Sequence, residues 1–166
     1  SYQTQEFSQV ELMGKIIGGY IIAVLATYLV GAALISQANL ANVAAMGATV
    51  GWATRMDAML HDALHMYEIY LPLVAVSFLI AFTAAALVIR QLPSLRLVGY
   101  VLAGFVGLVA IHLLMKAVLG LTGVAPTRTL AGLLGQGCAG ALGGYVFHLL
   151  TSKGTKAGVA DIQADN

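Results

Sequence analysis

Four long apolar runs, almost free of charged residues, limit how this chain can fold. They cover residues 12–35, 69–89, 97–121 and 129–150. Each has the roughly 20 residues that an α-helix needs to cross a hydrocarbon core of about 30 Å. Only 9% of the chain is charged, against about 25% in a typical soluble domain. The sequence therefore predicts an all-α integral membrane protein, a single membrane domain of residues 1–166 whose four transmembrane helices form an antiparallel bundle.

Small residues recur at every fourth position along three of these runs. Fourth neighbours lie on one helix face, and a face of small residues lets another helix backbone approach closely within a membrane. The expected helix-packing positions are Gly19, Ala23, Gly31, Gly99, Ala103, Gly107, Gly132, Gly140 and Gly144. Because four helices can bury only some of these faces within one copy, we expect a homo-oligomer or a subunit of a larger membrane complex.

The connection between the first two runs, residues 36–68, is long for a compact bundle. Residues 36–52 are uncharged and rich in Ala, Asn and Gly, which suits an interfacial segment or one that re-enters the membrane. From Thr54, a candidate N-cap, the pattern predicts an amphipathic helix at the interface. Its expected apolar stripe is Met56, Met59, Leu60, Ala63, Leu64 and Tyr67, and its polar stripe is Asp57, His61, His65 and Glu68.

The basic residues favour one side of the predicted bundle. With four spans, both termini lie on the same side, together with Lys15, Arg90, Arg96, Lys153 and Lys156, against Arg55 and Arg128 opposite. By the positive-inside rule, the expected location is a bacterial inner membrane with the N- and C-termini in the cytoplasm. Short turns are expected at residues 90–96 and 123–128, and a mobile polar tail at residues 152–166.

Two histidines of the predicted amphipathic helix are candidate metal ligands. His61 and His65 are one turn apart, and Asp57 and Glu68 continue the same face. Two such histidines with a carboxylate can hold a divalent metal such as zinc or copper. The same residues also suit the water-facing side of a surface helix. Since one helix usually supplies only two ligands to an ion, a metal site would need a second element.

Four polar residues lie inside the last two apolar runs: His112, Lys116, Gln136 and His148. Ionisable residues within a membrane are costly, and they face a bundle interior or a cavity. They are candidates for a polar path or site, although neighbouring helices could satisfy them or Lys116 could reach outward to the interface. A haem held by two histidines is disfavoured. At 1.5 Å per residue, His112 lies about 22 Å from the cytoplasmic start of its helix, whereas His148 lies close to that side.

Catalytic motifs are missing from the sequence, which has no Gly-x-Ser-x-Gly and no Walker A pattern. The net charge of +1 gives no basic field for nucleic acid, so membrane lipid is the expected surrounding. Tyr67 and Tyr70 suit an interfacial aromatic belt. The favoured function is a non-enzymatic, self-associating membrane subunit with a polar path or site for a small solute or ion. The alternative is a metal-binding protein or metalloenzyme, with its site on the outer amphipathic helix.

Overall fold

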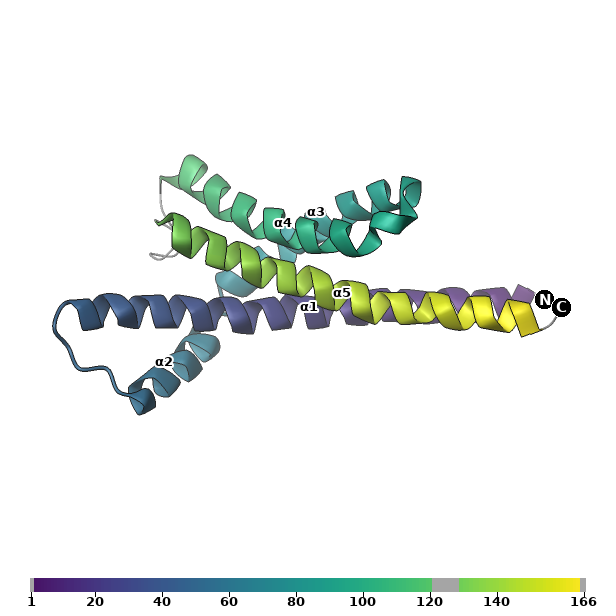
Figure 1. The fold of residues 1–166 in the computed structure, drawn as a ribbon. Helices are drawn as coiled ribbons and strands as arrows, with labels where there is room; N and C mark the ends of the chain where they lie inside the picture. Colours follow the sequence, from purple (N-terminus) through teal and green to yellow (C-terminus); the bar gives the residue numbers. More distant parts are fainter. Residues whose placement is uncertain (1, 121–128, 165–166) are drawn as a thin grey trace.

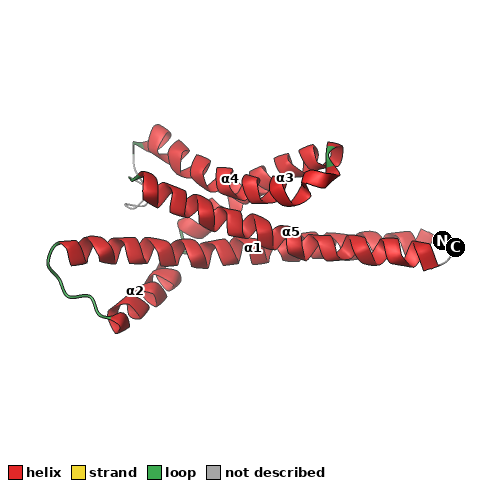
Figure 2. Cartoon of the chain, viewed as in Figure 1, coloured by secondary structure: helices red, strands yellow, loops and turns green. Residues whose placement is uncertain are grey.

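The computed structural model describes residues 2–120 and 129–164, and over these ranges the chain is built of helices joined by short loops (Figures 1 and 2). The turn expected at residues 123–128 lies outside the described residues. The elements are α1 (Tyr2–Ala45), α2 (Trp52–His65), α3 (Tyr70–Gln91), the 3-10 turn η1 (Pro93–Leu95), α4 (Arg96–Leu119) and α5 (Leu130–Ala164).

Four of the described helices, α1, α3, α4 and α5, are long and apolar enough to cross a membrane. The 22 residues of α3 and the 24 of α4 correspond to lengths of about 33 and 36 Å. The prediction of an all-helical chain with four helices of spanning length is therefore confirmed.

The first helix is much longer than the sequence pattern indicated. α1 runs unbroken for 44 residues, so it includes the polar start of the chain and the first part of the expected connection 36–68. Residues 36–45 contain neither Gly nor Pro and are rich in Ala, which favours a helix. The next glycine, Gly47, has a φ of +95° and donates its N–H to the carbonyl of Ala44 at 3.0 Å, which ends the helix. Residues 36–45 thus extend α1 and do not form a separate interfacial or re-entrant segment.

Two further helix ends differ from expectation. α2 begins at Trp52 with Gly51 at its N-cap, because the Gly51 carbonyl already accepts the N–H of Arg55 at 3.1 Å. The assignment of Thr54 as the N-cap was therefore wrong. At the other end of the chain, α5 continues as a helix to Ala164, where a mobile tail was expected from residue 152.

α2 packs on α1 by a different face from the one the pattern suggested. The half-buried residues of α2 include Ala58, Asp62 and Ala63, whereas Leu60 and Leu64 are 62% and 60% exposed. Two hydrogen bonds set this orientation. The Tyr28 hydroxyl donates to the Ala63 carbonyl at 2.5 Å, and Arg55 Nη1 donates to Gln37 Oε1 at 2.8 Å. Met59 and Ala63 of the predicted apolar stripe are consequently half-buried, whereas Leu60 and Leu64 are left uncovered.

The four long helices surround one core. α5 lies between α4 and α1, α3 packs on α4, and α1 touches α3 to close the ring, while α2 contacts α1. The start of α1, η1 and the end of α5 lie toward one end of the bundle, on the right in Figure 1, which we name the η1 end. The end of α4, the start of α5 and α2 lie toward the other, which we name the α2 end. The core runs between these two ends, and the kind of side chain that fills it changes along its length.

Glycines bring α4 and α5 into backbone contact. A Cβ added at Gly140 would lie 2.1 Å from the Gly104 carbonyl oxygen, and one added at Gly144 would lie 2.0 Å from that of Tyr100. Real Cβ atoms do not approach other atoms so closely, so these positions admit only glycine while the helices stay where they are. This close approach places Gln136, one turn before Gly140, in the core beside the end of α4.

Candidate functional site

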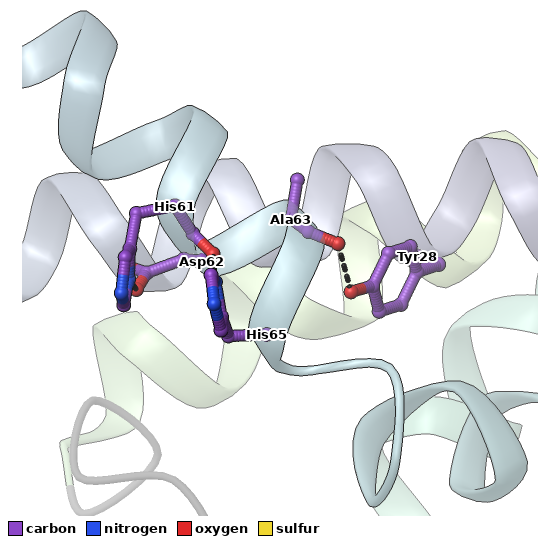
Figure 3. Close-up of polar contacts among 5 residues, drawn as sticks. All are labelled: Tyr28, His61, Asp62, Ala63 and His65. Atoms are coloured by element: carbon purple, nitrogen blue, oxygen red, sulfur yellow. Dashed lines mark hydrogen bonds and ion pairs between the residues drawn. The ribbon is translucent and has the colours of Figure 1, made fainter.

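His61 and His65 extend from the exposed side of α2, away from Tyr28 (Figure 3). Their rings stack with centroids 4.1 Å apart. His65 Nδ1 lies 2.7 Å from the His61 carbonyl oxygen, and His61 Nδ1 lies 3.5 Å from Asp62 Oδ1. One ring nitrogen of His65 is therefore taken up by its own helix.

A metal site on α2 would need further ligands. Asp57 and Glu68 are both exposed, and the carboxylate next to His61 is that of Asp62. Among the residues that the structure describes, no three His, Cys, Asp or Glu side chains gather as metal ligands would. Zinc or copper binding by His61 and His65 stays a prediction, and it would require a third ligand from elsewhere.

A different set of polar side chains meets inside the bundle, near the α2 end. The Tyr70 hydroxyl, at the start of α3, donates to Gln136 Oε1 of α5 at 2.5 Å. Gln136 Nε2 donates to the Gly31 carbonyl of α1 at 3.3 Å. The ring of His112, from α4, stacks on Tyr70 with centroids 6.4 Å apart. We name Tyr70, His112 and Gln136 the polar cluster; it joins side chains from three helices with the backbone of α1.

His112 differs from the other two members of the polar cluster in the hydrogen bonds of its side chain. It is 5% exposed, and Tyr70 and Gln136 are 2% and 1% exposed. The Gln136 side chain lies close enough to interact with the His112 ring, yet neither ring nitrogen makes a well-formed hydrogen bond among the described residues. A buried polar group left without a partner costs about 1–3 kcal/mol, and such groups call for a specific explanation, such as a bound water or ion.

Toward the η1 end, the core is filled by aromatic rings. Phe82 stacks on Phe78 with centroids 4.6 Å apart and on Phe147 at 4.7 Å. Tyr100 meets Phe147 edge-on at 4.9 Å and Phe82 at 5.8 Å. We name these four residues the aromatic cluster. It fills much of the core on the η1 side of the polar cluster, where the buried Thr27 lies against Gly143 together with the Phe78 ring.

His148 and Lys116 lie outside the polar cluster. His148, half-buried on α5, lies at the η1 end near Arg96, and its Nδ1 is buried without a hydrogen-bond partner in the described part of the chain. Lys116 is exposed near the end of α4. Of the four polar residues expected to line a common path, the structure therefore brings together only His112 and Gln136.

The small residues of α1 face other helices of the same copy. A Cβ on Gly19 would lie 3.2 Å from Cγ2 of Thr151 on α5, and one on Gly31 would lie 1.9 Å from the Tyr70 hydroxyl oxygen. Gly31 thus leaves the space that Tyr70 occupies. Ala23 is buried between them.

On α4, the small residues predicted to pack face α3. A Cβ on Gly99 would lie 3.0 Å from Cδ1 of Ile89, and one on Gly107 would lie 2.9 Å from Oγ of Ser77. Gly140 and Gly144 of α5 lie against the α4 backbone, as described above. The two remaining positions are half-buried: Ala103 and Gly132.

Several residues that shape the site were missed from the sequence. Tyr70 was assigned to an interfacial belt, yet it is buried, whereas Tyr67 beside it is exposed. Gly104 lies one residue beyond the ridge expected on its helix. Counting back from His112 in steps of four gives Leu108, Gly104 and Tyr100, all of them buried. The polar residue therefore marks the buried face of α4, and that signal was available in the sequence.

Comparison of this chain with protein-family models, with curated proteins and with solved structures finds no match.

Proposed function

We propose that this protein is a non-enzymatic membrane subunit that holds a small polar solute in the polar cluster. The observation that carries this proposal is the buried ring of His112, whose two nitrogens make no well-formed hydrogen bond among the described residues, although the Gln136 side chain lies near the ring. In a membrane, no surrounding water can satisfy them. A solute that hydrogen-bonds to the ring would remove that cost.

The chemistry of the polar cluster favours a solute without net charge. A neutral imidazole offers one donor and one acceptor. Tyr70 and Gln136 add a hydroxyl oxygen and an amide, and the cluster itself contains no carboxylate, ammonium or guanidinium group. A neutral hydrogen-bonding molecule of the size of water, or somewhat larger, therefore suits it better than an ion does.

The aromatic cluster favours a site that opens toward one side only. It argues against a continuous path through one copy of the protein. The four rings of the aromatic cluster, joined through Phe82, lie between the polar cluster and the η1 end. Apolar constrictions of this kind resist the entry of water and ions. The solute would therefore enter and leave at the α2 end.

Cysteine accessibility tests this proposal. In a Cys138→Ala background, which removes the single native cysteine, His112→Cys should react with a membrane-impermeant methanethiosulfonate reagent added on the α2 side and not on the η1 side. The matched control is Leu108→Cys, one turn away on the same helix and 0% exposed, which should stay unreactive from both sides. An unreactive His112→Cys would refute solute access to the cluster.

A flux measurement separates a closed site from a path. Proteoliposomes containing the protein are loaded with glycerol or urea, and their shrinkage after an osmotic step is followed by light scattering. The aromatic cluster predicts no flux above that of empty liposomes. A flux that disappears in His112→Leu would instead demonstrate a path through the bundle and overturn the closed site.

We further propose that the four long helices cross a bacterial inner membrane as an antiparallel bundle with both termini in the cytoplasm. Their lengths and apolar composition support insertion, and Arg90 and Arg96 at the η1 end support this orientation under the positive-inside rule. The exposed Leu60 and Leu64 of α2 would then rest on the opposite membrane surface. Impermeant labelling of Gly51→Cys from the periplasmic side, in the Cys138→Ala background, checks the orientation, and labelling from the cytoplasm alone would reverse it.

We also propose self-association, through fewer small residues than the sequence pattern indicated. Most of the predicted packing glycines face other helices of the same copy, whereas a Cβ added at Gly14 or Gly18 would have nothing within 4 Å. These two residues, one turn apart on α1, form a small-residue face available to a second copy. Native mass spectrometry gives the copy number. Gly18→Leu should lower it, and a monomer in both lipid nanodiscs and mild detergent would contradict the proposal.

A further inference from the structure

A groove of about 590 Å³ lies between α1 and α3 near the η1 end. Its volume falls within the range of about 300–1,000 Å³ that is typical of small-molecule sites. The walls are apolar: Leu12 and Ile16 come from α1, and Leu79 and Ala86 from α3. Phe82 of the aromatic cluster lines its floor.

One cation lines this mostly apolar groove. Arg96, the first residue of α4, is half-buried, and its guanidinium carbon lies 5.1 Å from the ring centroid of Tyr100. Its Nη2 donates to the hydroxyl of Thr151, which also lines the groove. Arg96 Nε is buried and has no hydrogen-bond partner among the residues described. The side chain is thus held in place and keeps an unused donor.

Among the residues whose side chains the structure describes (2–118, 120 and 129–152), Arg96 has no counterion. The ion pairs found there join Lys15 to Glu11 and His61 to Asp62. A guanidinium stays protonated at any physiological pH, and a charge that is partly withdrawn from water without a partner is costly. Arg90 differs from Arg96, because it is exposed at the end of α3 and lies outside the groove.

We propose that this groove binds an anionic phospholipid, with an acyl chain along α1 and α3 and the phosphate on Arg96. An apolar trough that ends in a fixed cation matches an amphiphile with an apolar tail and an anionic head. Guanidinium groups bind phosphate through charge-assisted hydrogen bonds. Arg96 directly follows the turn between two helices of spanning length, so it lies at headgroup depth, where basic pockets recruit anionic lipids. This site is separate from the polar cluster and does not depend on the solute proposed there.

Native mass spectrometry of the delipidated protein tests the site with two lipids of identical acyl chains. We expect one phosphatidylglycerol per chain to bind at least about tenfold more tightly than phosphatidylcholine. Arg96→Gln should abolish that preference, whereas Arg90→Gln, which removes the same charge from an exposed position near the same turn, should keep it. Equal retention of phosphatidylglycerol by Arg96→Gln and the wild type would overturn the proposal.

A second pair of variants keeps the cation and blocks the trough. Ala86→Phe fills the groove and should weaken phosphatidylglycerol binding about tenfold. Ala84→Phe, an equal enlargement at an exposed position outside this groove, should not. Melting temperatures of all four variants show whether each is folded. If Ala86→Phe is folded and binds phosphatidylglycerol like the wild type, the acyl chain does not lie in the groove and the proposal fails.

Two alternative occupants are distinguished in the same experiment. Glycerol 3-phosphate, which carries the head without the chains, should not bind at millimolar concentration. If this soluble phosphate binds as tightly as the whole lipid, the apolar groove does not contribute to binding. A fall in copy number in Arg96→Gln, with lipid binding unchanged, would identify a second copy of the chain as the occupant. Either result would refute a lipid site.

Discussion

The two ends of the bundle core are filled in opposite ways. Toward the α2 end, Tyr70, His112 and Gln136 bring hydroxyl, imidazole and amide groups together, and the two nitrogens of His112 make no well-formed hydrogen bond in the described chain. Toward the η1 end, Phe78, Phe82, Phe147 and Tyr100 stack on one another. Both regions are equally buried, so burial alone does not tell a site from packing. The difference lies in whether the buried side chains complete one another's hydrogen bonds and packing contacts.

The largest expected effect comes from the aromatic cluster. Phe82→Ala removes the ring that contacts the other three and should lower the unfolding free energy by about 3–5 kcal/mol. It can be measured by titration with sodium dodecyl sulfate in mild detergent. Leu87→Ala, on the exposed side of the same helix, should stay within about 0.5 kcal/mol of the wild type. Equal losses at the two positions would show that the rings do not hold the η1 half together.

The contact between α4 and α5, which lies between the two clusters, gives the next effect. Gly140→Ala places a Cβ 2.1 Å from the Gly104 carbonyl oxygen, so the helices must separate, at a cost of about 2–3 kcal/mol. Gly135→Ala on the same helix, where an added Cβ would meet Cδ1 of Leu34 at 4.0 Å, should instead gain up to about 1 kcal/mol from helix propensity. The same titration measures both changes. A stabilising Gly140→Ala would contradict the backbone contact and, with it, the placement of Gln136.

Substitutions in the polar cluster should lower the unfolding free energy by less, and the effects of two substitutions should not add. Gln136→Leu leaves the buried Tyr70 hydroxyl without its acceptor and should cost about 1–3 kcal/mol. Adding Tyr70→Phe removes the stranded donor, so the double variant should be more stable than Gln136→Leu alone. A double-mutant cycle on the unfolding free energy measures this coupling. Additive losses would mean that the hydroxyl and the amide do not pair.

The smallest effect concerns the hydrogen bond that ties α2 to the bundle. Tyr28→Phe removes the donor to the Ala63 carbonyl and should cost about 0.5–1.5 kcal/mol. Amide hydrogen exchange should rise in α2 and stay unchanged in α3. Tyr67→Phe, at an exposed tyrosine, serves as the control. Phe keeps the ring that contacts Tyr70 at 5.7 Å, so faster exchange throughout the core would show that the hydroxyl supports more than the attachment of α2.

Local patterns in the sequence were sufficient for the helices and insufficient for the site. Apolar runs specify helices because their length and composition act within each segment, and the glycines of α5 indicated a close contact before its partner was known. Helix ends were harder to place. The extension of α1 to Ala45 depended on the absence of a breaker before Gly47, and the weakly apolar composition of residues 36–45 concealed it.

What the sequence alone determined is the class of molecule: helical throughout the described residues, with four segments long and apolar enough to span a membrane. Only the tertiary structure decided which polar residues meet. His112 and Lys116 are four residues apart, yet one is buried and the other exposed, and Tyr70 joins a site that its neighbours gave no reason to expect. These outcomes depend on which helices lie side by side, because a hydrogen bond between distant segments exists only once packing has brought its donor and acceptor together.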